Sequence, residues 1–122
     1  EERGLHHTLL VVQDTMGHVF GCFASEPWKI HQRFYGTGET CVFQIHPRQL
    51  LWRWNRVQGT HNDYFQFSTH EGLGVGGSGH FAVWLDNDLF EGSSNPCNTF
   101  ASESLSGTPD FHVAAVELWH VA

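Results

Sequence analysis

The chain has 122 residues, which fits one domain, and its ten Phe and five Trp can supply an aromatic core. Thirteen Asp and Glu against six Lys and Arg give a net charge of −7, which disfavours nucleic acid as a partner because phosphate binding needs a basic face. No apolar run is long enough to span a membrane and no signal-type segment is found, so the chain is predicted to be soluble, without membrane insertion. Three cysteines with no C-x-x-C spacing predict a reducing compartment, by default the cytoplasm.

The first predicted elements are two short strands, residues 8–13 and 18–24, joined by a hairpin. Gly17 lies between them and tolerates the positive φ that closes such turns. Residues 25–28 predict one short helical turn, with Ser25 at the cap position and Pro27 in the first turn. Further strand patterns occupy residues 40–46, 50–56, 64–69, 80–85 and 111–121.

The last pattern is the longest strand, and alternate residues along it are predicted to share one face. These residues are Phe111, Val113, Ala115, Glu117, Trp119 and Val121. Many short strands with polar turns and little helical periodicity predict a mainly β chain, a two-sheet antiparallel β-sandwich with a few short helical turns. No repeat or linker divides residues 1–122, so they are interpreted as a single domain.

The middle of the chain is dense in glycine. Gly72, Gly74 and Gly77 match G-x-G-x-x-G, the spacing of a dinucleotide-binding loop. That loop must open a helix whose N-terminus binds pyrophosphate, whereas residues 80–85 read as a strand and residues 86–88 as a tight turn. Nucleotide binding is therefore disfavoured and no cofactor is predicted. These glycines are interpreted as positions where the backbone turns or approaches another segment closely.

Histidine and serine provide no complete catalytic or metal-binding pattern. The ten histidines are dispersed apart from His6 and His7, and none forms H-x-H or H-E-x-x-H, so no metal is predicted. Ser78 is not the nucleophile of a G-x-S-x-G elbow because His80 occupies the last glycine position. No catalytic residue is therefore assigned among them.

Thiols and carboxylates leave more alternatives. Cys22 and Cys41 lie inside strand patterns, so only Cys97, in a polar loop, is predicted to be accessible and remains a candidate redox thiol. Asp86 and Asp88 could act as an acid–base pair, although Asp commonly satisfies backbone groups in turns. Glu39, in the glycine loop Gly36-Thr37-Gly38-Glu39-Thr40, either bonds nearby backbone amides or is displayed to a partner.

Several short pieces of the sequence occur in a specific order. They are Leu9-Leu10-Val11-Val12 with Asp14 and Gly17, Val19-Phe20-Gly21, Phe34-Tyr35-Gly36-Thr37-Gly38-Glu39-Thr40, Gly76-Gly77 with Phe81-Ala82-Val83-Trp84-Leu85-Asp86, Cys97 with Thr99-Phe100, and Val116-Glu117-Leu118-Trp119. Through these pieces the sequence resembles the TLDc domain over nearly all of residues 5–121. TLDc domains usually begin earlier, with a mainly helical segment that has no counterpart before Leu5. The chain is therefore expected to be the β-rich larger part of the domain, and the resemblance also implies a sandwich of two antiparallel sheets.

The resemblance implies a function as well. Proteins with TLDc domains are associated with oxidation resistance and, through direct binding, with regulation of the vacuolar proton-pumping ATPase, and the family has no agreed catalytic residues. The chain is therefore expected to be a non-enzymatic interaction module that binds the V1 sector. The loop positions expected at the interface are Gly36, Thr37, Gly38, Glu39, Gly76, Gly77, Asp86 and Asp88.

Two alternatives accompany this expectation. Arg53 and Arg56 lie in one predicted strand and could form a small electropositive patch. The rival function is a thiol-dependent antioxidant enzyme that consumes peroxide through Cys97. The oligomeric state is left open.

Overall fold

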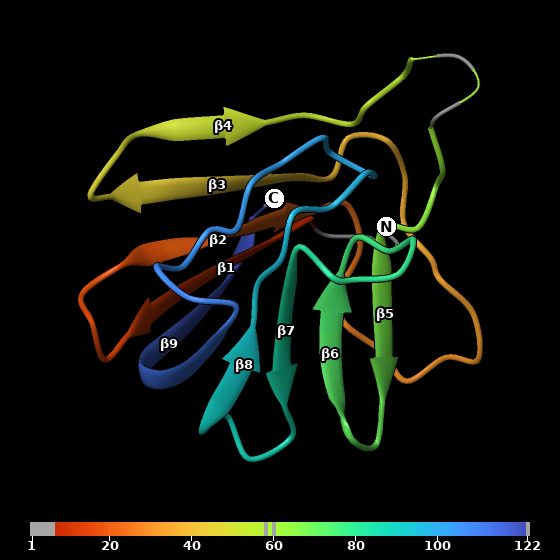
Figure 1. Ribbon diagram of the computed structural model, residues 1–122. Coiled ribbons are helices and arrows are strands. Elements are labelled where there is room, and N and C mark those ends of the chain that lie inside the picture. Colours follow the sequence, from red (N-terminus) through yellow and green to blue (C-terminus); the bar gives the residue numbers. More distant parts are fainter. Residues whose placement is uncertain (1–6, 58, 60, 122) are drawn as a thin grey trace.

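Nine β-strands make up the regular structure of the described residues, and no helix occurs among them (Figure 1). The computed structural model describes residues 7–57, 59 and 61–121. The strands are β1 (His7–Asp14), β2 (Val19–Ala24), β3 (Cys41–His46), β4 (Leu50–Trp52), β5 (Gln66–Thr69), β6 (Gly72–Val75), β7 (Val83–Asp86), β8 (Glu91–Ser93) and β9 (Asp110–Val121). All named pairings are antiparallel. The prediction of a mainly β chain is confirmed.

Hydrogen bonds join all nine strands in the order β4-β3-β2-β1-β9-β8-β7-β6-β5. β9 connects the two halves, because residues 110–112 pair with β8 whereas Val113 and residues 115–121 pair with β1. The chain thus forms one continuous sheet in place of two separate sheets. Figure 1 shows the strands of the β5–β8 half running at a steep angle to those of the β1–β4 half.

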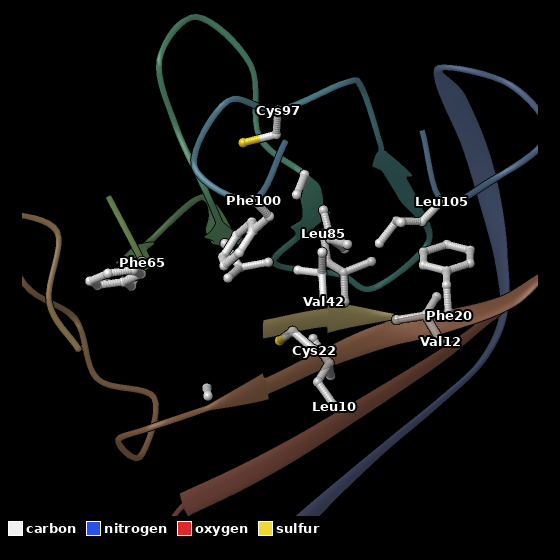
Figure 2. Close-up of a cluster of buried hydrophobic side chains, with 14 of the residues drawn as sticks. Leu10, Val12, Phe20, Cys22, Val42, Phe65, Leu85, Cys97, Phe100 and Leu105 are labelled. Atoms are coloured by element: carbon white, nitrogen blue, oxygen red, sulfur yellow. The ribbon is translucent and has the colours of Figure 1, made fainter. Parts of the chain in front are cut away.

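The two halves contribute to one apolar core (Figure 2). Figure 2 shows Leu10 and Cys22 of the β1–β2 half on one side, with Leu85 and Phe100 on the other. The buried cluster consists of Leu10, Val12, Phe20, Cys22, Ala24, Val42, Phe65, Val75, Ala82, Val83, Leu85, Cys97, Phe100, Leu105 and Phe111. Because removal of apolar surface from water is the main force that favours folding, this shared core stabilises the two halves together.

The predictions for the first part of the chain have mixed outcomes. β1 and β2 form the expected hairpin, with Gly17 at φ +93°. The predicted helical turn at residues 25–28 is wrong. Ser25 does not cap a helix there: its hydroxyl accepts a hydrogen bond from the backbone N–H of Thr37 at 2.7 Å, and the N–H of Glu26 donates to the side chain of Gln66. Bonds to distant segments thus replace local ones.

Strand boundaries also differ in the middle of the chain. The strand predicted at residues 50–56 ends at Trp52, and the one predicted at residues 80–85 begins only at Val83. β6 and β8 were not predicted as strands, since both contain glycine, which has a low strand propensity. Tertiary packing overrides that propensity in both.

The predicted face of β9 is wrong beyond Val113. The register between β1 and β9 shifts by one residue there, which leaves Ala114 as the extra residue of a β-bulge. After the bulge, Val116 lies opposite the fully buried Val12 and so takes the inner face. Glu117, Trp119 and Val121 consequently lie on the other face from Phe111.

Candidate interaction site

The loop of residues 36–40 is held against the body of the domain. Gly36 has φ +99°, and a Cβ there would lie 2.7 Å from Oε1 of Gln66. A Cβ at Gly38 would lie 2.3 Å from the ring of Trp54. The fully buried Thr40 contributes its hydroxyl to hydrogen bonds with Ser25. Glycine is therefore required where the loop contacts the domain, and the loop backbone has little room to move.

Glu39 extends from this loop into solvent, with 70% of its side chain exposed. Its Oε1 lies 3.3 Å from Nε2 of His7 and accepts a hydrogen bond from the hydroxyl of Thr37 at 3.5 Å. Within the described part of the chain, no backbone amide donates to the Glu39 carboxylate. Of the two alternatives for Glu39, this geometry fits display to a partner.

A cleft of about 540 Å³ opens beside the loop. We call it the arginine cleft; its lining residues are Gly38, Glu39, Thr40, Cys41, Arg53, Trp54 and Arg56. Burial raises the pKa of the Cys41 thiol, while a backbone hydrogen bond at Phe23 and the positive charge of Arg53 act in the opposite direction. Arg53 and Arg56, which are close in the sequence, thus line the same cleft.

Gly76 and Gly77 are buried under other residues. Gly76 has φ +82°, and a Cβ there would lie 2.6 Å from Sγ of Cys97. A Cβ at Gly77 would lie 2.8 Å from Tyr64, and the Gly77 N–H donates to the hydroxyl of Thr99 at 3.0 Å. Both glycines permit close packing, so their effect on any partner is through the shape of this end of the domain.

A row of aromatic rings explains the glycines of β6. Phe81 stacks on Trp84 with ring centres 5.0 Å apart, and a Cβ at Gly74 would come within 3 Å of both rings. The row continues through neighbouring ring contacts to Phe67, Phe34 and Tyr64. The G-x-G-x-x-G spacing therefore accommodates aromatic side chains, and no helix follows it in the described chain. The signal that sequence reasoning missed is the set of aromatic residues on either side of the glycines.

Asp86 is the last residue of β7, and Asp88 lies in the turn between β7 and β8. Oδ1 of Asp86 accepts hydrogen bonds from the backbone N–H of Phe90 at 3.0 Å and of Glu91 at 3.4 Å, so this carboxylate stabilises the turn. Asp88 is exposed. Asp86 pairs with the first residue of β6, whereas Gly76 and Gly77 follow its last, so the strands separate the two groups (Figure 1). Gly76 and Gly77 therefore lie at the other end of β6 and β7 from Asp86 and Asp88.

Comparison with known proteins identifies the family of this chain. The family model of the TLDc domain matches residues 2–122. The chain belongs to the TLDc family. It is 42% identical to oxidation resistance protein 1 of rat and of human, and 38% identical to human nuclear receptor coactivator 7, in each case over 112 residues and 91% of the chain. The TLDc chain covers 12–13% of the length of these relatives.

The cysteines of this TLDc domain are free thiols. The prediction that Cys97 is accessible is wrong, because it is buried. It is 4% exposed, lies in the apolar core, and its thiol donates to the carbonyl of Gly77 at 3.4 Å (Figure 2). Burial also raises the pKa of Cys22 far above the ordinary thiol value. Because a reactive cysteine must be accessible as a thiolate, the reason for assigning a redox role to Cys97 no longer holds.

Sequence reasoning missed a buried polar cluster at the hairpin of β1 and β2. Asp14 is 1% exposed, and its carboxylate accepts hydrogen bonds from the N–H groups of Met16 and His18 and from the hydroxyl of Ser106. Nδ1 of His18 lies 3.7 Å from Oδ2 of Asp14. Ser106 therefore bonds the carboxylate and not the imidazole, so the three residues do not form a nucleophile–base pair. Their arrangement stabilises the hairpin.

Among the described residues of the TLDc domain, no three His, Cys, Asp or Glu side chains lie close enough to hold a metal ion. No helix in this part of the chain is long and apolar enough to cross a membrane.

Proposed function

We propose that this TLDc domain is a non-enzymatic interaction module of an oxidation-stress-resistance protein. In this proposal it binds the V1 sector of the vacuolar proton-pumping ATPase in the cytoplasm and regulates the pump. Membership of the family that includes proteins named oxidation resistance protein 1 supports the stress-resistance role. The single observation that supports a binding surface is Glu39, exposed on a loop whose backbone is held against Trp54 and Gln66.

Such a module can regulate a rotary pump without chemistry of its own. Binding shifts the pump toward whichever assembly or rotary state it contacts more favourably, by no more than the difference in affinity between the states. A pre-ordered loop helps, since little conformational entropy is lost when its side chains meet a partner. The contact surface in this proposal is the end of the domain that carries Gly36, Thr37, Gly38 and Glu39.

Binding to purified V1 tests this proposal, with Glu39→Ala and Asp88→Ala as a matched pair. Both remove one exposed carboxylate, but the two residues lie on different loops of the domain. If the 36–40 loop is the interface, Glu39→Ala is expected to weaken binding about tenfold, while Asp88→Ala stays within about twofold of the unmodified chain. Isothermal titration calorimetry on folded variants measures both.

The outcomes separate the partner from the surface. Binding that Asp88→Ala weakens and Glu39→Ala does not would place the interface at the β7–β8 turn. Binding that ignores both changes would keep V1 as the partner and reject both loops. Absence of binding by a chain that unfolds cooperatively would reject the V1 proposal for this domain.

A further inference from the structure

Arg53 and Arg56 provide an uncompensated positive charge in an acidic protein. Arg48, by contrast, lies 3.0 Å from the carboxylate of Glu103. Among the residues that the structure describes, no carboxylate lies within ion-pair distance of Arg53 or Arg56. Because the chain as a whole carries −7, two such guanidinium groups beside one cleft reverse the sign of the local charge.

Trp54 fixes the position of one of these charges. Its indole N–H donates to the carbonyl of Asn62 at 2.7 Å, and its ring meets Phe65 edge-on at 5.3 Å. The guanidinium carbon of Arg56 lies 5.1 Å from the centre of the Trp54 ring, a cation–π contact. Arg56 therefore lies over a ring that these two contacts hold in place, which reduces the entropy that it loses on binding a ligand.

The chemistry of the arginine cleft favours a ligand with several carboxylates. A guanidinium group matches a carboxylate with two parallel hydrogen bonds. A volume of about 540 Å³ exceeds what one small anion needs and is in the range of pockets that hold larger ligands. Glu39 also lines the cleft and repels carboxylates, so an acidic ligand lies toward Arg53 and Arg56.

We propose that the arginine cleft binds an acidic peptide segment, whose carboxylates pair with Arg53 and Arg56 over the ring of Trp54. The site is formed by side chains of the segment that follows β4 and by the 36–40 loop. The proposal goes beyond V1 binding: Gly38 and Glu39 belong to the loop proposed to contact V1, but the charges that hold the acidic peptide are those of Arg53 and Arg56.

A capped hexaglutamate peptide is the probe for this site. Titrated into the isotope-labelled 122-residue chain, it is expected to give saturable NMR shifts at the Trp54 indole N–H and at the amides of Gly38 and Thr40. The double change Arg53→Gln with Arg56→Gln is expected to weaken binding about tenfold, since two charge-assisted contacts are lost. Glu39→Gln is expected to tighten binding about twofold or more by removing the repulsion.

Arg33→Gln is the matched control. Arg33 is an exposed arginine without a described carboxylate partner, and it lies outside the arginine cleft. Its variant should bind hexaglutamate within about twofold of the unmodified chain, as expected for an exposed charge that does not line the cleft. Should the double variant fail to fold, Arg53→Lys with Arg56→Lys keeps both charges and is expected to weaken binding about threefold.

Three results would overturn the proposal. One is the absence of saturable shifts with hexaglutamate. Another is an equal loss of affinity in the Arg33 variant and the double variant, which would indicate non-specific attraction. The third is binding of inorganic phosphate but not of hexaglutamate, which would make the cleft a small-anion site. The hexaglutamate titration contains no part of the ATPase. Failure of the V1 experiment therefore leaves the result of this titration unaffected.

Discussion

Two glycine-rich segments, residues 36–40 and residues 72–79, look alike in composition and differ in structure. In the first, glycines let a loop lie against Trp54 while Glu39 extends into solvent. In the second, Gly72 and Gly74 are strand residues covered by aromatic rings. Glycine content therefore predicts a close approach of the backbone but does not say whether the segment is displayed or covered; the neighbouring side chains decide that.

A cysteine near each segment shows the same contrast. Cys41 lines the arginine cleft beside Gly38 and is half-buried. Cys97 packs against Gly76 and is 4% exposed. The sequence suggested the opposite order, since Cys41 lies in a strand and Cys97 in a polar loop. The accessibility of a cysteine in a strand depends on which face it occupies, and that of a cysteine in a loop depends on the side chains that pack over it. The polarity of the neighbouring sequence indicates neither.

The largest effect is expected for Gly72→Ala in the covered segment. The new Cβ would lie 2.2 Å from the carbonyl oxygen of Leu85 and 2.6 Å from the ring of Trp84. Because a backbone atom cannot move aside easily, the free energy of unfolding should fall by about 3 kcal/mol, as measured by urea denaturation. Gly79→Ala is the control: φ is +97° there but nothing lies within 4 Å, so only a strain of about 1 kcal/mol is expected. Equal losses in the two variants would show that the contacts around Gly72 cost no more than the backbone strain at Gly79, which would contradict close packing over β6.

An intermediate effect is expected for Cys97→Ser. The substitution places a hydroxyl among core side chains, so the free energy of unfolding should fall by about 1–2 kcal/mol. Cys41→Ser, at a half-buried site, should change it by less than about 0.5 kcal/mol. Thiol labelling of the folded chain, followed by mass spectrometry, should modify Cys41 before Cys97 and Cys22. Faster labelling of Cys97 would contradict the packing and restore the redox alternative.

The smallest effect on stability is expected for Glu39→Gln in the displayed segment. Its carboxylate is exposed, so the free energy of unfolding should change by less than about 0.5 kcal/mol in a thermal or urea melt. Gly38→Ala on the same loop is the matched change, because its Cβ would lie 2.3 Å from the ring of Trp54, and a loss of about 2 kcal/mol is expected. A large loss with Glu39→Gln would mean that Glu39 serves the fold and not a partner.

The sequence predicted local features well where one short pattern decides them. The hairpin at Gly17 and the turn that contains Asp86 formed as expected, because turn chemistry depends on a few adjacent residues. The helical turn expected at residues 25–28 does not form, because the segment makes long-range hydrogen bonds. The backbone N–H of Glu26, for example, donates to the side chain of Gln66, forty residues away. A bulge at Ala114 reversed the predicted face of β9, and a single extra residue leaves no signal in the alternation.

The candidate site shows the same division. Glu39 was recognised from the glycines around it, since they signal a constrained loop. The separation of Gly76 from Asp86 could not be predicted, because it depends on how strands β6 and β7 pair. Arg53 and Arg56 lie close together in the sequence, yet only the fold places Arg56 over the ring of Trp54 and the 36–40 loop beside both arginines.

Sequence alone thus determined the mainly β class, the family and the positions of the constrained turns, because periodicity and turn chemistry are properties of neighbouring residues. Tertiary structure alone decided that the two halves join through β9, that aromatic rings cover the glycines of β6, and that Cys97 is buried. The physical reason is that burial and charge pairing depend on contacts between residues far apart in the chain, which pack only when the whole core forms.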